Sequence, residues 1–366
     1  MIDRRVALII PGGLGTGKNN LGVPVLEQIV RLLSNEMKVT VFQLYKVNQD
    51  YQYKGFELLD FKAGNRVIQY SKFLYTFYKE HKKKRFTTVH GFWGWPCGFL
   101  AVVFGKVFNI KSIVSVLGGD AASIPEIGYG HLRNKFSRNM ILWTLRTANE
   151  ATALTHFLVK NLHDAGLTRE LKIIPWGVDQ ENFSFVSKPL QKPIQFLHIA
   201  NLNKIKDQET LLRAFKIIHE TASSYLTILG EGSEEEKIKQ LIDQLRLNEF
   251  VTILKQLPYQ QLPALYHQSD ILLHTSLTEG QSEVVTEAMS CGVIVCGTNV
   301  GLLHDLPECC ISVPARAHEV LAKEVEKLIQ DNDRMNTIRS KARTWCSAHS
   351  LEWTVKQMID LYRHEN

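Results

Sequence analysis

Short apolar runs alternate with longer amphipathic runs along nearly the whole chain, and no other feature narrows the possible folds as much. Runs such as Val6–Ile10 and Ser112–Leu117 have the length of buried strands, whereas Val23–Leu33 and Arg66–Lys79 have the apolar spacing of helices. Strands that alternate with helices are typical of parallel sheets covered by helices. The scheme starts again at Ile194–Ala200 without an internal sequence repeat, so the pattern predicts an α/β protein with two Rossmann-like domains.

Proline residues mark the expected join between these domains. Pro175-Trp176-Gly177 interrupts regular structure, and Pro189 and Pro193 follow. We therefore expect a first domain over residues 1–175, a linker over 176–193 and a second domain over 194–348. The remaining segment, 349–366, contains a final amphipathic helix over Leu351–Tyr362.

The composition favours a protein of the cytoplasm. The apolar runs fall short of the ~20 residues needed to span a bilayer, and the N-terminus leads into a strand rather than a signal peptide. The six cysteines lack the spacing of a metal site or a redox motif, so we expect reduced, mostly buried thiols.

Charge is divided unevenly between the two halves of the chain. Residues 1–175 hold 24 Lys and Arg against 12 Asp and Glu, whereas the remainder holds 19 against 25. A basic half attracts anionic partners such as a membrane surface, a lipid phosphate or an anionic glycan, although it can also serve solubility alone. His81–Arg85, after an aromatic-rich helix, could dock on an anionic membrane from the cytoplasmic side or be an exposed helix end. The aromatic residues lack the pattern of an RNA-binding module, so nucleic acid is not expected.

The run from Glu279 to Val295 carries the most informative acidic residues, and it reads as loop, helix and apolar strand. Free N–H groups at a helix N-terminus bind anions, and a carboxylate accepts two hydroxyl hydrogen bonds. Glu279 at the helix mouth and Glu287 two turns further in therefore suit a sugar nucleotide, with hydroxyls at both ends and phosphate between. Glu283 reads more readily as a solvated acidic stripe, but it stands with its neighbours among the candidate donor-site residues, which include Gly280, Gln281 and Ser282.

A glycine-rich loop, Gly12 to Asn19, follows the first strand and nearly spells a phosphate-binding P-loop. A P-loop has Ser or Thr after its lysine to hold Mg²⁺, whereas Lys18 is followed by Asn19. Two other readings stand beside a P-loop NTPase. Gly12 and Gly13 could bring backbone N–H groups close to a ligand, or they could form a plain turn.

Aromatic residues follow another strand, at the edge where α/β sheets bind ligands. Trp93 and Trp95 could form a platform for an acceptor sugar or lipid, together with Phe92, or they could cover the core between helices. His90 could position an acceptor hydroxyl or be a hydrogen-bonded core histidine.

Glu279-x7-Glu287, with Ala288-Met289 and with Gly292 before the next strand, resembles the donor-site motif of the retaining glycosyltransferases of family 4. The resemblance extends over nearly the whole chain and is most specific between residues 195 and 305. It implies the GT-B architecture, in which two facing Rossmann-like domains leave an interdomain cleft and a final helix returns to the first domain. It also implies transfer from a UDP- or GDP-sugar to a glycan or lipid-linked acceptor, with retention at the sugar carbon and no cofactor or obligatory metal.

The resemblance also implies roles for single residues. Lys206 matches a lysine that meets the donor's diphosphate, but Asn201 stands where the family usually has an arginine. Gly230 and Glu231 lie where the family places the nucleotide base, and Gly12-Gly13 matches a family Gly-Gly loop. Leu117 stands where many members have a histidine, so Asp120 is the nearest titratable candidate to orient acceptor or sugar hydroxyls, unless it caps its own loop.

The resemblance thus makes Lys206, Glu279 and Asp120 the catalytic candidates of a hexosyltransferase, and it implies a role in cell-surface polysaccharide or glycolipid synthesis. Because Asn201 and Leu117 replace charged groups, a sugar-nucleotide-binding protein with weak or no catalysis is a second reading. The P-loop NTPase built on Gly12–Lys18 is a third.

Overall fold

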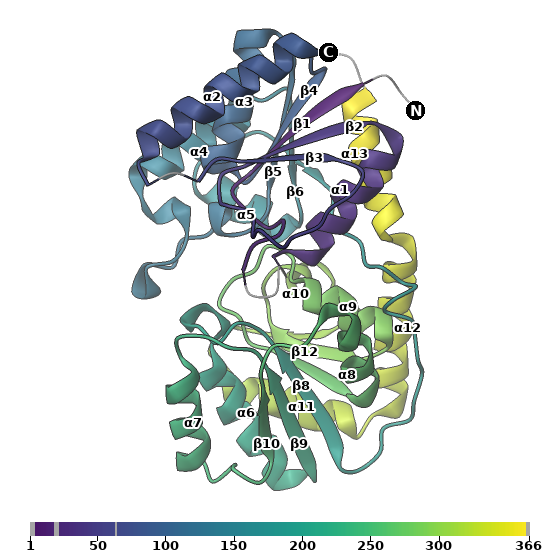
Figure 1. Ribbon diagram of the computed structural model, residues 1–366. Helices are drawn as coiled ribbons and strands as arrows, with labels where there is room; N and C mark the ends of the chain where they lie inside the picture. Colours follow the sequence, from purple (N-terminus) through teal and green to yellow (C-terminus); the bar gives the residue numbers. More distant parts are fainter. Residues whose placement is uncertain (1–3, 18–21, 63, 364–366) are drawn as a thin grey trace. The chain divides into compact units, whose positions relative to one another are not determined.

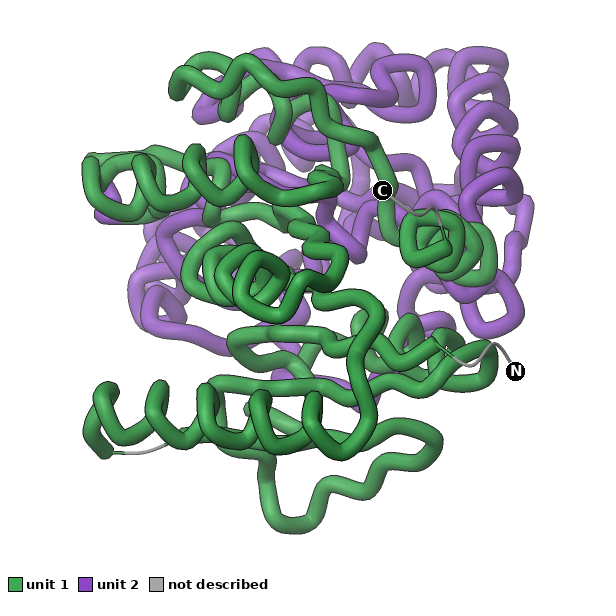
Figure 2. Tube along the Cα trace, turned by 90° about the horizontal axis from the view of Figure 1, so that it is seen from above, with its two compact units in different colours: residues 1–125, 129–176, 351–366 green, residues 126–128, 177–350 purple. Residues whose placement is uncertain are grey.

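The computed structural model describes residues 4–17, 22–62 and 64–363, and the chain divides into two compact units. Unit 1 comprises residues 1–125, 129–176 and 351–366, and unit 2 comprises residues 126–128 and 177–350 (Figure 2). Each unit has its own parallel sheet covered by helices (Figure 1). The prediction of two Rossmann-like α/β domains is confirmed.

Unit 1 is built on a seven-stranded parallel sheet in the order β3-β2-β1-β4-β5-β6-β7. Its strands are β1 (Arg5–Ile10), β2 (Lys38–Gln43), β3 (Glu57–Asp60), β4 (Thr88–Phe92), β5 (Lys111–Val116), β6 (Glu150–Ala153) and β7 (Lys172–Ile173). Its helices are α1 (Pro24–Glu36), α2 (Arg66–Lys83), α3 (Phe99–Phe108), α4 (Lys135–Thr147), α5 (His156–Asp164) and α13 (Leu351–Arg363).

The strand residues of unit 1 alternate between two apolar layers. Val6, Leu8 and Ile10 of β1 pack in the cluster that contains residues of α1 and α13. Ala7 and Ile9 point the other way, into a cluster rich in phenylalanine from α2 and α3. Burying one such phenylalanine side chain contributes about 2–3 kcal/mol, so each helix layer is fixed to the sheet by its apolar face.

Helix α13 belongs to unit 1 although it lies at the far end of the sequence. Arg4 donates a hydrogen bond from Nη1 to the Tyr362 carbonyl (2.5 Å), and Thr354 donates from Oγ1 to the Pro175 carbonyl (2.8 Å). The Tyr362 hydroxyl lies 2.8 Å from His90 Nδ1, beneath the sheet. These contacts attach the last helix to both the first strand and the centre of the unit.

Unit 2 repeats the design with a six-stranded parallel sheet in the order β10-β9-β8-β11-β12-β13. Its strands are β8 (Ile194–Ile199), β9 (Ser224–Leu229), β10 (Val251–Leu254), β11 (Ile271–His274), β12 (Ile294–Thr298) and β13 (Ile311–Val313). Its helices are α6 (Gln208–Thr221), α7 (Glu235–Gln244), α8 (Leu262–Gln268), α9 (Glu283–Cys291), α10 (Leu302–Asp305), α11 (His318–Ile329) and α12 (Asn332–Ala348).

In unit 2 the order of strands places β8 and β11 side by side at the centre, although 71 residues separate their last and first members. The carboxyl ends of parallel strands lie at one edge of a sheet, where the connecting loops are free to bind ligands. The loop after β8 and the loop after β11 are therefore neighbours. None of the helices within the described ranges combines the length and apolar composition that crossing a bilayer requires.

Candidate functional site

The loop after β8 and the loop after β11 are tied together by backbone hydrogen bonds. Thr275 donates from Oγ1 to the carbonyls of Lys206 and Asp207, both at 3.0 Å. Leu277 donates its N–H to the Ile205 carbonyl at 2.8 Å. Asp207 also caps α6 by accepting from the Thr210 N–H (3.3 Å). The backbone that carries Lys206 is thus held at a fixed distance from the 275–282 loop.

Lys206 and Glu279 form an ion pair across this junction, with Nζ 2.5 Å from Oε1. Their side chains remain 20% and 13% exposed, so the pair is largely buried but still open to a ligand. His274 Nε2 lies 3.5 Å from the same carboxylate oxygen. Burial alone would raise the pKa of Glu279, but the Lys206 ammonium and His274 together hold it well below its usual range. Glu279 is therefore ionised at neutral pH.

Helix α9 begins directly behind this pair. Ser282, the residue before its first turn, has a φ of 79°, in the left-handed region, and its hydroxyl does not cap the helix. The first N–H groups of a helix have no carbonyl partners in a preceding turn. In α9 the Val285 N–H donates to the Ser282 carbonyl (3.1 Å), which leaves the N–H groups of Glu283 and Val284 for an anion in front of Ser282. Gly292 ends the helix with a φ of 83°.

Glu287 is buried on α9, and Glu283 in its first turn is half-buried, so Glu283 does not lie on a fully solvated stripe. Burial, reinforced by the neighbouring Glu287, raises the pKa of Glu283 to about 8. Burial also raises the pKa of Glu287 to about 7, against the hydrogen bonds from Tyr266 and Tyr259, which lower it. The two carboxyl groups lie on one helix in a poorly solvated site. Ionisation of one therefore disfavours ionisation of the other at neutral pH.

Glu287 is 5% exposed and accepts a hydrogen bond from the Tyr266 hydroxyl at 2.7 Å. Tyr266 itself is fully buried, between α8 and α9. A carboxylate can accept about four hydrogen bonds, so the tyrosine contact fixes the orientation of Glu287 while leaving capacity for another donor.

Two histidines of this region were not identified from the sequence. His274 ends β11, and His198 lies in β8 with Nδ1 2.8 Å from the Leu273 carbonyl. Burial lowers the pKa of His198 to about 4, so it is neutral at pH 7. The His198 Nε2 atom and the Ser276 hydroxyl are buried without a hydrogen-bond partner among the described residues. The sequence feature that could have identified these histidines is their position near the ends of two apolar runs, just before the loops that carry Lys206 and Glu279.

The other candidates of unit 2 surround this centre. Asn201 is exposed, and Gln208 Nε2 donates to its carbonyl at 3.2 Å, while Lys204 is exposed on the same loop. A Cβ atom added to Gly230 would lie 1.9 Å from the Ala200 carbonyl oxygen, so close packing of two loops requires this glycine. Glu231 accepts from the Leu202 N–H (2.9 Å) through its carbonyl. Gly280 and Gln281 are buried in the loop before Ser282.

The remaining candidates lie in unit 1. Gly12 and Gly13 follow β1, and Gly13 has a φ of 117° where the chain turns toward α1. The next residue, Leu14, exchanges two hydrogen bonds of 3.0 Å with the side chain of Gln43. In the described part of this loop, the backbone N–H and carbonyl of Leu14 are therefore already hydrogen-bonded within the protein. Lys18 and Asn19, which would complete a P-loop, lie outside the described residues.

His90 is a core histidine, which corrects its assignment to the acceptor site. Its exposed fraction is zero, and its ring nitrogens lie 2.8 Å from the Tyr362 hydroxyl and 2.7 Å from Ser115 Oγ. Burial lowers its pKa to about 3. With both nitrogens occupied inside the unit, His90 has no atom to offer an acceptor.

Asp120 caps its own loops, which corrects its assignment as a catalytic and acceptor-site residue. It is fully buried and accepts from the N–H groups of Gly94 (2.9 Å), Gly118 (2.9 Å) and Leu117 (3.3 Å). Burial raises its pKa, and the backbone hydrogen bonds oppose this rise. The carboxylate joins the loop after β4 to the loop after β5, because both loops donate to it.

The aromatic residues at the end of β4 and just after it differ in how deeply they are buried. Phe92 is fully buried against His90 and Trp176, so it belongs to the core and not to an acceptor platform. Trp93 and Trp95 are half-buried. Trp93 has a φ of 65°, and the ring of Trp95 packs between Phe99 and Phe136 at centroid distances of 5.2 and 5.4 Å.

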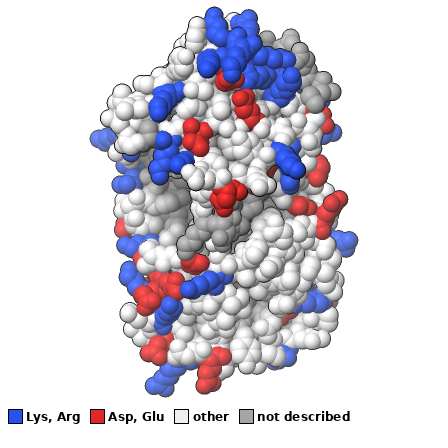
Figure 3. Space-filling view, in the orientation of Figure 1, with Lys and Arg blue, Asp and Glu red and all other residues white. Residues whose placement is uncertain are grey.

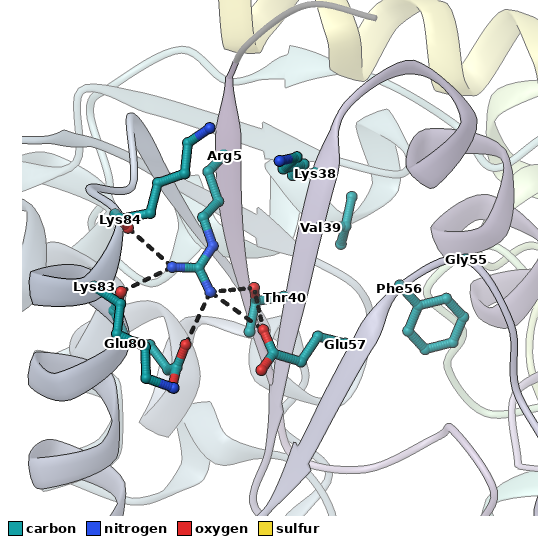
Figure 4. A pocket seen from close by; sticks show the side chains of 10 residues that line it. All are labelled: Arg5, Lys38, Val39, Thr40, Gly55, Phe56, Glu57, Glu80, Lys83 and Lys84. Atoms are coloured by element: carbon teal, nitrogen blue, oxygen red, sulfur yellow. Dashed lines mark hydrogen bonds and ion pairs between the residues drawn. The ribbon is translucent and has the colours of Figure 1, made fainter.

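A pocket of about 450 Å³ opens at the other edge of the unit 1 sheet (Figure 4). The guanidinium of Arg5 lies within it and donates to Thr40, Glu57 and Glu80 side chains at 3.0–3.2 Å. Arg5 also donates to the Glu80 and Lys84 carbonyls. These partners use the charge of Arg5 to join α2 to β1, β2 and β3, so we assign this cluster a structural role.

No group of three or more His, Cys, Asp or Glu side chains suited to a metal ion occurs within the described residues. The six cysteines are buried free thiols. Burial raises the pKa of Cys291 to about 12, and it raises that of Cys346 similarly. These thiols are inert apolar groups in the core.

Comparison with known proteins finds a family that the second unit resembles. Residues 179–345 match the family described as Glycosyl transferases group 1, which covers nearly all of unit 2. The chain is 27% identical over 249 residues to the phosphatidylinositol N-acetylglucosaminyltransferase GPI3 subunit of Saccharomyces cerevisiae (strain YJM789). That match covers 64% of this chain and 52% of the relative. N-acetyl-alpha-D-glucosaminyl L-malate synthase of Bacillus anthracis is 27% identical over 172 residues, which cover 44% of this chain and 45% of that one.

Solved structures resemble the fold of the whole chain. Sucrose-phosphate synthase from Thermosynechococcus elongatus superposes with a TM-score of 0.83 at 19% identity, over 98% of each chain. Anabaena HepE, in complex with UDP and glucose, superposes with a TM-score of 0.76 at 16% identity, over 98% of this chain and 99% of that one. These likenesses establish the two-domain fold of the GT-B type. The chain spans about half the length of the curated relatives it matches.

Proposed function

Residues 179–345 match the family described as Glycosyl transferases group 1, and on this premise we propose that the chain is a retaining hexosyltransferase. It would move a sugar from a nucleotide-sugar donor to a glycan or lipid-linked acceptor. Unit 2 would hold the donor, since the family match and the cluster around Glu279 coincide there.

The ion pair between Lys206 and Glu279 is the observation that carries this proposal. When a sugar leaves a diphosphate, negative charge grows on the phosphate oxygens, and a preorganised cation stabilises the transition state. Lys206 is the cation in this role, and the first-turn N–H groups of α9 next to Ser282 add to it. Glu279, ionised and partly exposed, then accepts hydrogen bonds from hydroxyls of the transferred sugar.

Glu287 is assigned to the ribose of the donor. Its hydrogen bond from Tyr266 orients the carboxyl, and it retains capacity to accept from a hydroxyl. Glu283 lies between the sugar end and the ribose end of this site, where a diphosphate would pass. Its raised pKa supports this placement, because a neutral carboxyl does not repel a phosphate.

The donor class is supported by a structurally similar protein with a bound nucleotide or nucleotide sugar. HepE is described in complexes with UDP and with UDP-glucose. The acceptor class is supported by relatives named for phosphatidylinositol and for colanic acid biosynthesis. We therefore place the activity in polysaccharide or glycolipid synthesis, with a UDP- or GDP-sugar as donor and no obligatory metal.

The test is a screen of UDP- and GDP-sugars, each with candidate acceptors, in which released nucleotide is measured and products are analysed by mass spectrometry. We expect one donor class to be consumed, and the anomeric signal of the product by NMR to match that of the donor. Lys206→Ala should lower the rate by about 10²–10³, as for removal of one transition-state donor.

Lys204→Ala is the matched control, because Lys204 lies on the same loop but is exposed. It should keep at least half of the wild-type rate. Nucleotide binding without turnover would favour a catalytically weak binding protein, in keeping with the uncharged Asn201. Equal rates in Lys206→Ala and the wild type would exclude the proposed role of Lys206.

A further inference from the structure

Helices α2, α3 and α4 of unit 1 lie next to one another, and α2 and α3 cover the phenylalanine-rich cluster (Figure 1). Phe77 of α2 stacks on Phe104 of α3 at a centroid distance of 3.9 Å. Phe99 of α3 in turn packs against Trp143 of α4 at 5.5 Å. We call the outward surface of α2, α3 and α4 the helical face.

The helical face exposes large apolar side chains. Among the described residues, thirteen large hydrophobic side chains are exposed, and eight of them lie on these three helices. The three helices contain 41 of the 366 residues, so the enrichment is about fivefold. The eight are Val67, Ile68, Leu74, Tyr75 and Tyr78 on α2, Val107 on α3, and Phe136 and Trp143 on α4.

The exposed residues follow helical stripes. On α2, Ile68, Lys72, Tyr75, Lys79 and Lys82 recur at intervals of three or four and are all exposed, whereas Phe73, Phe77 and His81 point inward. On α4 the exposed stripe is Phe136, Asn139, Trp143 and Arg146. Apolar and cationic side chains thus alternate along the outer line of these two helices.

The charge of the helical face has one sign. The three helices carry nine Lys and Arg, and their one acidic residue, Glu80, is buried and paired with Arg5 and Lys83. Lys82 lies 5.7 Å from the ring centroid of Tyr78, and Lys106 lies 5.6 Å from that of Trp143. Figure 3 shows Lys and Arg gathered over the upper part of the view, which belongs to unit 1.

We propose that the helical face docks on the surface of an anionic lipid bilayer. Tyrosine and tryptophan rings fit the boundary between headgroups and acyl chains, and lysine reaches from apolar contacts to charged headgroups. Helices with an apolar and cationic face lie in the plane of such an interface without crossing it. The partner must supply negative charge, because eight of the nine cations are exposed and the three helices expose no acid.

The same charge argues against a second copy of this chain on the helical face. Two such faces would bring nine cations against nine, and like charges in an interface are destabilising. The proposal does not depend on the glycosyltransferase activity. It rests on exposed side chains of unit 1, whereas the donor site lies in unit 2.

The test is co-sedimentation of the full chain with vesicles of phosphatidylcholine alone, or of phosphatidylcholine with 30 mol% phosphatidylglycerol (roughly the anionic fraction that attracts basic segments). We expect binding to the anionic vesicles, little binding to the neutral ones, and a weaker interaction as salt is raised. Lys72→Gln with Lys79→Gln and Lys135→Gln should weaken binding on the order of a hundredfold, since each cation near an anionic surface contributes about fivefold.

Tyr75→Ser with Trp143→Ser tests the apolar part and should weaken binding about tenfold or more. Matched controls remove equally exposed groups elsewhere. Lys172→Gln with Lys192→Gln and Lys323→Gln, and Tyr225→Ser with Val320→Ser, should bind within twofold of the wild type. Melting curves establish that all variants fold.

Several outcomes would overturn the proposal. These are failure of the wild type to bind anionic vesicles, equal binding of the helical-face and control variants, or equal binding to neutral vesicles. If the helical-face variants instead lose self-association in sedimentation velocity, or lose binding to RNA, the face serves another macromolecule and the membrane assignment falls.

Discussion

Both units carry titratable side chains in the loops at the carboxyl ends of their strands, but the two sets have different surroundings. In unit 2, Lys206 and Glu279 contact each other, stay partly exposed, and adjoin buried polar atoms without partners among the described residues. In unit 1, Asp120 and His90 are fully buried, and their polar atoms are occupied by backbone or side-chain partners of the same unit.

This difference separates a binding site from a structural network. A charged group whose hydrogen-bonding capacity is used inside the protein holds loops together, whereas one with exposed surface and remaining capacity can bind a ligand. Position at the end of a parallel strand is shared by both sets, so it does not discriminate between them. What discriminates between them is whether the hydrogen-bonding capacity of each side chain is already used by partners within the protein.

The largest expected effect comes from removing Glu279. Glu279→Ala should lower the transfer rate by at least about 100-fold, because sugar hydroxyls lose their acceptor and Lys206 loses its positioning partner. The melting temperature should stay within a few degrees, since the two loops are also joined by hydrogen bonds from the Thr275 hydroxyl and the Leu277 N–H to backbone carbonyls. Steady-state kinetics and a thermal melt check both statements. A fully active variant would contradict the assignment of unit 2 as the donor site.

Removing Asp120 should have the opposite pattern. Asp120→Ala leaves three backbone N–H groups of two loops without their acceptor, at a cost of about 3–4 kcal/mol in the free energy of unfolding. Chemical denaturation measures this loss. Nucleotide binding by the folded variant should remain within about twofold of the wild type. A stable variant that loses transfer activity would return Asp120 to the active site and break the comparison.

Acid should act on unit 1 through His90. Its pKa is lowered to about 3 in the folded state, against about 6.5 when unfolded, so the unfolded chain takes up the proton first. The contribution to stability is complete above pH 6.5 and is lost as the pH falls toward 3. When the pH is lowered from 7 to 4, the free energy of unfolding of the His90→Gln variant should fall by about 2–3 kcal/mol less than that of the wild type. Exposed His131→Gln is the control, and it should follow the wild-type curve.

A smaller effect of opposite sign is expected in unit 2. The pKa of Glu283 is raised to about 8 when folded, so its contribution to stability is complete below about pH 4.5 and is lost as the pH rises toward 8. Solvent screens a half-buried carboxyl, so only part of this shift reaches stability, and Glu283→Gln should be about 1 kcal/mol more stable than the wild type at pH 8 and nearly equal at pH 4.5. Denaturation curves at the two pH values decide this. A variant less stable at pH 8 would show that the carboxylate, not the acid, is the favoured form.

Most of the fold could be predicted from the sequence because its elements have strong periodicity. The helix expected at Arg66–Lys79 is α2 (Arg66–Lys83), and the strand expected at Val6–Ile10 is β1 (Arg5–Ile10). Strand β3 gave little signal, since it has four residues with an acid at each end and one buried leucine. Helix α12 buries five of its seventeen residues, so its polar composition hides its apolar face.

The site was predictable only in part, and the reason is physical. Glu279 and Lys206 could be found because one lies before a helix in a distinctive run and the other after a central strand. The burial of His90 and the occupation of Asp120 depend on contacts with Tyr362 and Gly94, which local sequence does not reveal. His198 and His274 were missed because a histidine within an apolar run resembles any other core residue.

The most direct test of the difference between the two sets is a calorimetric titration with the nucleoside diphosphate that the transfer assay releases. Wild type, Lys206→Ala and Asp120→Asn are compared under identical conditions. We predict that Lys206→Ala weakens binding at least about tenfold, because a charge-assisted contact to phosphate contributes about 1.5–3 kcal/mol. Asp120→Asn should bind within twofold of the wild type. Unchanged affinity in Lys206→Ala, together with lost affinity in Asp120→Asn, would contradict the placement of the donor site in unit 2.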